Sequence, residues 1–394
     1  MVVVFLVVAF FVAVFFVVAF LAVAFLAVVF LVVVFAERCA NVLHLPVTVI
    51  DKRAHIGGNC YSETDLETGV EYHKYGSHIF HTSNKEVWEY ITSFSEFNHY
   101  CHRVYTVFGG EVFPMPINLG TINQFYRKAM SPIDARKLIH DEIIKEKLDF
   151  PENLEEKAIS LIGRPLYEAF FRGYTIKQWE KEPYELASDI ITRLPIRYNY
   201  DNRYFSDTYE GIPVCGYGEL FAKILDNPLI EVLLNTSWED FKCNVKSDDV
   251  VIYTGAIDAF FLYELGSLEW RTIDFEIERY SYPDYQGTTV MNFADANVPY
   301  TRIHEFKHYH PERPDTGKTI IFKEYSRFAK REDELYYPVF TGRNQQLFDA
   351  YSCLAAKQVP NVVFCGRLGQ FKYFDMDDSI AEALNMFKRF CSAM

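Results

Sequence analysis

The hydrophobic pattern of the chain changes abruptly at residue 37. Residues 1–36 contain only Met, Val, Phe, Leu and Ala, and the first charged residue is Glu37. A run of this length can cross a bilayer, since about 20 apolar residues span one. No Lys or Arg precedes the run, so the charge that orients a membrane segment or opens a signal peptide is missing. Three interpretations stay open: a membrane anchor, a buried strand followed by a helix start, and a non-native stretch that replaces the usual N-terminus.

After residue 37 the pattern alternates between helix and strand signals. Residues 37–45 predict the end of a helix, Pro46 ends it, and residues 47–50 predict a short strand followed by Asp51. This order is the second half of a β-α-β unit, whose first half would lie inside the apolar run. Residues 85–180 carry mostly helical patterns, whereas 190–210 and 268–340 alternate in a way typical of an antiparallel sheet. Further apolar strands at 250–255 and 361–366 predict α/β pieces split by inserted segments.

Composition narrows the class of protein. A chain of 394 residues predicts two or three domains. Its net charge of −14 argues against a nucleic-acid binder, and its 17% aromatic content excludes a disordered chain. None of the eight cysteines forms C-x-x-C, which argues against a zinc ribbon or a thioredoxin-type site. Scattered cysteines favour a reducing, cytoplasmic setting.

The first candidate site is the segment 51–59, Asp-Lys-Arg-Ala-His-Ile-Gly-Gly-Asn. An acidic residue at the end of the second strand suits the ribose hydroxyls of an adenosine group. Gly57 and Gly58 would let the backbone approach a planar cofactor. The alternative is an ordinary turn with a surface acid, but Arg53 and Asn59 at fixed offsets favour the cofactor.

A second candidate combines His73, His78 and His81. Three histidines within nine residues suggest a metal, but no Asp, Glu or Cys is clearly paired with them and H-E-x-x-H is absent. Gly76 between them predicts a tight turn. Packing is one alternative, and we expect a position facing a cofactor, with no metal.

Two further sets of residues suggest phosphate binding. A strand that runs into Gly366 and Arg367 and then a helix start offers a cation and free N–H groups, the alternative being a glycine turn with a solvated arginine. The inserted segments carry guanidinium and hydroxyl groups that suit a diphosphate, at Arg193, Arg197, Arg203, Tyr204, Arg302, Tyr336 and Tyr337. Each alone is more often structural, and together they predict a nucleotide-sugar site.

Six ordered motifs carry a family resemblance. They are the segment 51–59, YGSHIFHT at 75–82, GYTIKQW at 173–179, DNRYFSD at 201–207, VPYTRI at 298–303 and GRLG at 366–369. Together they resemble the bacterial UDP-galactopyranose mutase family from about residue 36 to the C-terminus.

The resemblance implies an isomerase that interconverts UDP-galactopyranose and UDP-galactofuranose through an adduct between the sugar and N5 of reduced FAD. It implies an α/β fold with a Rossmann-like FAD-binding domain (1–84, 211–265 and 341–394), a helical domain with a substrate lid (85–189) and an antiparallel sheet domain (190–210 and 266–340). It also implies a cytoplasmic homodimer that binds UDP-galactose and no nucleic acid. Membrane association stays open because of residues 1–36.

Roles for single residues follow from the same motifs. The resemblance implies a catalytic set of Arg193 and Arg302 on the diphosphate, with His81 and Asp375 beside flavin and substrate. The implied substrate-binding set is Phe170, Phe171, Tyr174, Thr175, Trp179, Arg193, Tyr204, Arg302, Tyr337 and Tyr373. The implied cofactor-binding set is Asp51, Lys52, Arg53, Gly57, Gly58, Asn59, His78, Ile79, Arg367, Tyr373, Asp375 and Met376.

One motif of the family is missing. Its G-x-G-x-x-G turn counts back to Ala27, Val29 and Val32, where side chains would obstruct the approach of backbone to a pyrophosphate. We therefore expect the chain to bind FAD weakly or not at all, and the absence favours a replaced N-terminus over an added anchor. Two alternative functions remain: a flavin-dependent oxidoreductase of the amine-oxidase-like superfamily, and a membrane-tethered, non-catalytic nucleotide-sugar binder.

Overall fold

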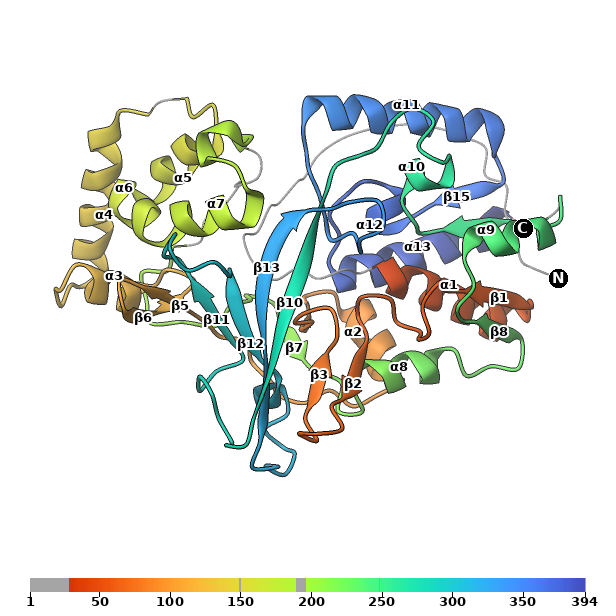
Figure 1. Ribbon diagram of the computed structural model, residues 1–394, viewed down its shortest axis with the longest axis horizontal. Helices are drawn as coiled ribbons and strands as arrows, with labels where there is room; N and C mark the ends of the chain where they lie inside the picture. The colour runs from red at the N-terminus through yellow and green to blue at the C-terminus, as the bar shows by residue number, and fades with distance from the viewer. Residues whose placement is uncertain (1–27, 149, 189–195, 248, 394) are drawn as a thin grey trace.

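The computed structural model describes residues 28–148, 150–188, 196–247 and 249–393. A large twisted sheet occupies the middle of the molecule (Figure 1). A group of helices lies at one end of it, and short parallel strands covered by helices lie at the other end. The chain therefore has the mixed α/β fold expected from its pattern.

The large sheet has seven strands in the order β14-β10-β13-β12-β11-β5-β6. Neighbouring strands are antiparallel except for β11 and β5, which are parallel. The longest pairing joins β10 to β13 from Arg271 opposite Phe328 to Tyr280 opposite Thr319. The strand bounds are β5 Val104–Phe108, β6 Glu111–Met115, β10 Trp270–Tyr280, β11 Val290–Phe293, β12 Arg302–Glu305, β13 Thr319–Phe328 and β14 Tyr337–Pro338.

The helical group follows β6 in the chain. It consists of α3 Leu119–Phe125, α4 Pro132–Glu146, α5 Leu154–Ile162, α6 Arg164–Tyr167, the π-helical turn η1 Glu168–Arg172, α7 Gly173–Trp179 and the 3-10 turn η2 Pro183–Glu185. Asn118, Ser131 and Asn153 cap α3, α4 and α5 through their side chains, as polar residues before an apolar helical pattern do. The helical pattern expected here is confirmed for these segments.

Two expectations about secondary structure are wrong in detail. Residues 104–115, inside the segment expected to be helical, form the β5–β6 hairpin. Gly109 and Gly110 turn it with φ values of 58° and 79°, which a two-residue hairpin turn requires. Conversely, residues 196–208, expected to join the antiparallel sheet, contain no strand. The alternation of tyrosine with polar residues there reflects turns around the site described below.

The remaining elements form the α/β part of the molecule. The predicted strand at 47–50 is β1 Val47–Ile50, which pairs in parallel with β8 Ile230–Leu233, and β9 Val251–Tyr253 pairs in parallel with β15 Val362–Phe364. Two short antiparallel pairs join β2 Ser62–Thr64 to β3 Glu71–His73 and β4 Phe80–Thr82 to β7 Tyr209–Gly211. The helices and 3-10 turns are α1 Val28–Leu43, α2 Lys85–Thr92, α8 Tyr217–Ile224, α9 Trp238–Phe241, η4 Lys242–Asn244, α10 Ile257–Phe260, η5 Phe306–Tyr309, α11 Gly342–Gln358, α12 Gly366–Gly369 and α13 Met376–Ala393.

Helix α1 contains residues 28–36, the part of the apolar run that the structure describes. Phe30 packs against Phe221 with ring centroids 4.8 Å apart, and Phe35 packs edge-on against Phe390 of α13 at 5.9 Å. The first charged residue, Glu37, is buried and accepts a hydrogen bond from Tyr90 at 2.8 Å. Residues 28–36 are therefore part of a core helix, which ends at Leu43 as predicted. No helix in the described ranges has both the length and the apolar composition needed to cross a membrane.

Candidate functional site

The centre of the candidate site is a buried ion pair between two strands of the large sheet. Arg302 begins β12 and lies directly opposite Glu324 of β13 in the strand register. Its Nε lies 3.0 Å from the Glu324 Oε1, and both side chains are at most 2% exposed. Burial lowers the pKa of Arg302, but the Glu324 carboxylate raises it more, so that the arginine stays charged. A charged guanidinium is thereby held at a fixed point inside the protein.

Tyrosine hydroxyls gather around this arginine. Arg302 donates through Nη2 to the Tyr174 hydroxyl at 2.6 Å. Tyr204 and Tyr337 lie close enough for the charge of Arg302 to act on their pKa values, and the Tyr337 ring lies nearly parallel to that of Tyr373, with centroids 6.5 Å apart. Burial raises the pKa of Tyr174 to about 12 and those of the other three further. All four hydroxyls are therefore protonated donors at neutral pH.

A second buried cation, Arg367, lies beside the same tyrosines. It is fully buried at the start of α12, and it donates to the carbonyls of Tyr336 at 2.9 Å and Phe374 at 2.5 Å. Its guanidinium carbon lies 4.5 Å from the Tyr373 ring centroid. Gly366 before it has a φ of 70°, so a glycine is needed where β15 turns into α12. Arg367, which the Gly-Arg motif predicted as a cation, is thus held in place by hydrogen bonds to two carbonyls.

Carboxylate and imidazole groups lie close to Arg367 and Tyr373. The pKa of Asp375 rises to about 6 because the group is buried and lies near Asp377 and Asp378, with His81 and Arg367 opposing the rise. The Nδ1 of His81 lies 2.8 Å from the Asp207 Oδ2, and its ring stacks on Phe205 at 3.6 Å. Burial lowers the pKa of His81, but Asp207 and the charges of Asp375 and Asp377 raise it above its ordinary value.

Helix α7 and the π-helical turn before it carry the proposed substrate aromatics. Thr175 is fully buried, and neither its hydroxyl nor the indole N–H of Trp179 has a hydrogen-bond partner in the described part of the chain. Those two donors are available to a ligand. Phe170 packs edge-on against Phe113 at 5.0 Å in the core of the helical group, and its contact with a substrate stays a prediction. Phe171 is partly buried next to the same core.

The segment 51–59 forms the turn expected after β1. The Arg53 backbone N–H donates to the Asp51 carboxylate at 2.9 Å, and the Arg53 side chain contacts Asn59 and Glu334. Gly57 has a φ of 92°, and a Cβ there would lie 2.8 Å from the Phe221 ring. The Arg53 Nε and Asn59 Nδ2 are buried donors without a partner among the described residues. Of the other members of this set, Lys52 is exposed and lies 3.3 Å from Glu334. The rest are buried, at Gly58, His78, Ile79 and Met376.

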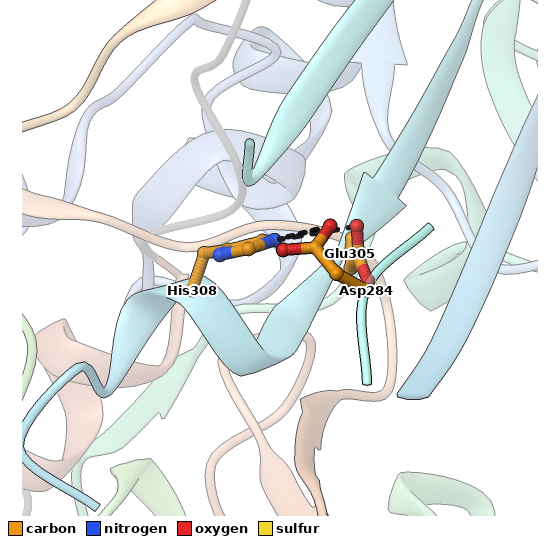
Figure 2. Close-up of side chains that lie close together, drawn as sticks. All are labelled: Asp284, Glu305 and His308. Carbon is orange, nitrogen blue, oxygen red and sulfur yellow. Dashed lines mark ion pairs between the residues drawn. The ribbon is translucent and has the colours of Figure 1, made fainter. Parts of the chain in front are cut away.

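Among the described residues, two sets of side chains match metal-ligand chemistry: one has three carboxylates, and the other has two carboxylates and a histidine. One is Asp375, Asp377 and Asp378, and the other is Asp284, Glu305 and His308 (Figure 2). In the second set the His308 Nε2 lies 3.5 Å from Asp284 and 3.3 Å from Glu305. Both Glu305 oxygens also accept backbone N–H groups, at 2.8 Å from Tyr285 and 2.8 Å from Gln286. The close approach of these three side chains is explained by the two ion pairs of His308 and by the hydrogen bonds that hold the 285–286 backbone on Glu305.

Some sequence-predicted residues lie outside the described ranges, and some important ones were missed. Arg193 and Ala27 belong to the residues outside those ranges, whereas Val29 and Val32 belong to α1. Sequence reasoning missed Glu324 and Asp207. The signal for Glu324 was available: a glutamate inside the apolar strand Ile-Ile-Phe-Lys-Glu-Tyr must be paired if it is buried.

Comparisons with known proteins match this chain to one enzyme family. The family model of UDP-galactopyranose mutase matches residues 169–373, and a model of an NAD(P)-binding Rossmann-like domain matches residues 33–94. A Klebsiella pneumoniae protein assigned as a UDP-galactopyranose mutase is 44% identical over 88% of this chain and 89% of its own. The dTDP-fucopyranose mutase of Escherichia coli is 41% identical over 86% of this chain and 91% of its own. The UDP-galactopyranose mutase of Mycoplasma genitalium is 32% identical over 85% of this chain and 86% of its own.

Solved structures confirm the Rossmann-like α/β fold. A crystal structure of reduced UDP-galactopyranose mutase superposes with a TM-score of 0.69 at 16% identity, covering 92% of this chain and 93% of the other. A putrescine oxidase mutant superposes with a TM-score of 0.53 at 10% identity, covering 93% and 98%. At these identities the likeness concerns the fold alone.

Proposed function

The chain belongs to the UDP-galactopyranose mutase family, and from that premise we propose that it interconverts UDP-galactopyranose and UDP-galactofuranose. The observation that carries the proposal is the buried Arg302–Glu324 pair surrounded by protonated tyrosine hydroxyls. A diphosphate that leaves the sugar gains negative charge as the bond breaks. A cation and hydroxyl donors that are already in place stabilise that charge without reorganising.

Each residue near the pair has a proposed task. Arg302 binds the diphosphate, and Tyr204, Tyr337 and Tyr373 donate to its oxygens. Tyr174 positions the uracil, and Thr175 and Trp179 offer their unpartnered hydroxyl and indole N–H to the substrate. Arg193 supplies the second cation. Two cations suit a diphosphate leaving group better than one, because the negative charge is spread over the non-bridging oxygens of both phosphates.

We propose FAD as the cofactor, in its reduced form. Most of the described residues fit it: Asp51 suits the ribose, Arg53 and Asn59 bring unpartnered buried donors, and Arg367 is a buried cation beside Tyr373. When bound, the flavin would supply the nucleophile that detaches the sugar from the diphosphate. His78 is neutral there, because burial lowers its pKa to about 3.

The N-terminus of α1 does not fit the same cofactor. The chain has no glycine before Gly57, so its sequence lacks the glycines that let backbone approach a pyrophosphate in a dinucleotide-binding motif. We therefore propose that flavin is held weakly by this chain. The test is an absorbance spectrum of purified protein mixed with FAD and then freed of unbound cofactor. A flavin band at one equivalent per chain would contradict weak binding.

The mutase activity has its own test. Protein, FAD and a chemical reductant are incubated with UDP-galactofuranose, and UDP-galactopyranose is measured by chromatography. The matched control is Arg302→Lys, which keeps the charge but loses the planar fork and should lose at least about tenfold in turnover. Absence of turnover by a chain that visibly retains reduced flavin would refute the proposed function.

A second substrate is favoured by one comparison. The dTDP-fucopyranose mutase is only slightly less similar to this chain than the first UDP-galactopyranose mutase relative. Both substrates share a nucleoside diphosphate on a pyranose. They differ at the base methyl, at the 2′-hydroxyl of the nucleoside and at the 6-hydroxyl of the sugar. Parallel assays with both nucleotide sugars decide between them through the ratio of kcat/KM. We further propose a cytoplasmic homodimer that binds no nucleic acid, as the family resemblance implies.

A further inference from the structure

A line of buried polar side chains connects the 75–82 segment to the phosphate-binding arginine. The Ser77 Oγ lies 2.5 Å from the His304 Nδ1, and the His304 Nε2 lies 2.9 Å from the Glu324 Oε2. The Glu324 Oε1 lies 3.0 Å from the Arg302 Nε. All four side chains are at most 2% exposed. Bulk water therefore does not compete for these contacts.

The strand register explains why both β12 residues meet one carboxylate. Arg302 and His304 are two residues apart on β12, so their side chains lie on the same face of the sheet. Arg302 is directly opposite Glu324, and His304 is opposite Phe322, two residues away on β13. The Glu324 carboxylate thus contacts Arg302, which lies directly across the strand pair, and His304, which lies diagonally across it. Thr301 adds a third contact, donating to Glu324 Oε1 at 3.1 Å.

The chemistry of the groups assigns the protons along this line. An ionised carboxylate only accepts hydrogen bonds, so the proton at the His304–Glu324 contact belongs to His304 Nε2. Burial lowers the pKa of His304 below its ordinary value, with Glu324 opposing, and the ring is neutral. Nδ1 of a neutral ring with a proton on Nε2 is an acceptor, and Ser77 donates its hydroxyl proton to it. Both hydrogen bonds of the line then join a donor to an acceptor, and the contact between Glu324 and Arg302 is an ion pair.

We propose that His304 is a positioning residue for diphosphate binding: it orients Glu324, which orients Arg302, and Ser77 holds His304 in the tautomer that this requires. The inference rests on the proposed function, because it takes Arg302 to be the group that binds the diphosphate. Its readout is the affinity for UDP, measured by calorimetry without flavin. The measurement requires neither a bound cofactor nor turnover of a sugar.

Two variants of the same side chain separate hydrogen bonding from packing. His304→Phe keeps a ring of similar shape in contact with Phe306, whose ring is 5.8 Å away and nearly parallel, but it removes both nitrogens. His304→Gln retains an amide N–H that reaches Glu324. The first should weaken UDP binding about tenfold or more, since a hydrogen bond to a buried charge is lost, and the second should stay within about threefold of wild type. His310→Gln is the control, because His310 is a buried histidine bonded to Glu312 outside the line.

The outcomes divide clearly. Equal UDP affinity for His304→Phe and wild type overturns the proposal. Loss of affinity that is as large in His304→Gln as in His304→Phe also overturns it, because the ring would then be needed for its shape alone. If His304→Phe does not fold, Ser77→Ala replaces it: about threefold weaker UDP binding at an unchanged Tm supports the line, and unchanged affinity refutes it.

A measurement on the unliganded protein keeps this inference distinct from the proposed function. Nitrogen-15 spectra of histidine-labelled protein, with His304→Gln identifying the signal, should show a neutral His304 that carries its proton on Nε2. A charged ring, or a proton on Nδ1, overturns the proposed line whatever UDP does. Failure of the wild-type protein to bind UDP while this tautomer is observed would instead overturn the proposed function.

Discussion

The ionised carboxylate of Asp375 lowers the free energy of unfolding, and Asp375→Asn should therefore stabilise the protein at neutral pH. Its pKa rises from 3.8 to about 6 because partial burial removes water from the carboxylate, and Asp378 and Asp377 raise it further against His81 and Arg367. One of its oxygens has no hydrogen-bond partner in the described part of the chain. An amide keeps the shape of the side chain and cannot ionise.

The magnitude follows from the difference between the two pKa values. Between pH 4 and pH 6 the folded state holds a proton on Asp375 that the unfolded state has released, so stability falls as the pH rises through this range. About two pKa units amount to about 3 kcal/mol above pH 7, falling to about 1 kcal/mol at pH 4.5. With an unfolding entropy of about 0.8 kcal/mol per kelvin for a chain of this size, Tm should rise by about 4 °C at pH 7.5.

The assay is thermal unfolding followed by circular dichroism at pH 7.5 and pH 4.5. Wild type and Asp375→Asn are compared with Asp349→Asn, which changes an exposed helical aspartate of α11. The expected result is a higher Tm for the first variant that shrinks at the lower pH, and no such change for the second. A Tm that is equal or lower at pH 7.5, or a gain that does not depend on pH, would refute the reasoning. Stabilisation by removal of a site residue would also fit the usual conflict between stability and function.

Three further predictions concern single contacts. Lys177→Met removes an ammonium that donates to the carbonyls of Phe293 at the end of β11 and of Asp295 and Tyr300 in the loop before β12, at 2.6, 3.0 and 3.1 Å. The free energy of unfolding in urea should fall by about 2 kcal/mol, and UDP binding should weaken because this loop leads into Arg302. Unchanged values would contradict a contribution of these three bonds. Gly173→Ala places a Cβ 2.3 Å from the Ala294 carbonyl oxygen, so Tm should fall, although alanine normally stabilises a helix by about 1 kcal/mol. Asp65→Asn should lower the free energy of unfolding by about 2 kcal/mol at neutral pH. Burial raises the pKa of Asp65, but its hydrogen bonds, of which that from Arg279 has the largest effect, together outweigh burial and lower this pKa to about 2. That difference should be complete above pH 4 and vanish as the pH falls towards about 2, and a difference that persists there would count against the ion pair.

The local parts of the fold could be predicted from the sequence because they depend on neighbouring residues. The end of α1 at Leu43, the strand β1 and the turn at Gly57 follow from a proline, an apolar run and a paired glycine. The β5–β6 hairpin was missed although its glycine turn was visible, since one short alternating segment was read within a longer helical pattern.

The arrangement of the site could be predicted only as a set of residue types. Arginine, tyrosine and glycine motifs spread over the chain pointed to a diphosphate and a dinucleotide, and the structure brings Tyr174, Arg302, Tyr337 and Tyr373 together. The same motifs do not say that Phe170 also packs on Phe113 in the core of the helical group. Hydrophobicity and period place a residue inside the protein, but they do not say which buried surface it meets.

The sequence by itself determined the chemistry of this protein. It defines which donors, cations and carboxylates the chain has, and it shows that the glycines of a dinucleotide-binding turn are missing. Only the tertiary structure decided how those groups act. The pairing of Arg302 with Glu324 depends on the register of two strands, and the pKa of Asp375 depends on which groups exclude water from it. Desolvation and long-range pairing are properties of surfaces that meet when the chain folds, and no local segment contains both partners.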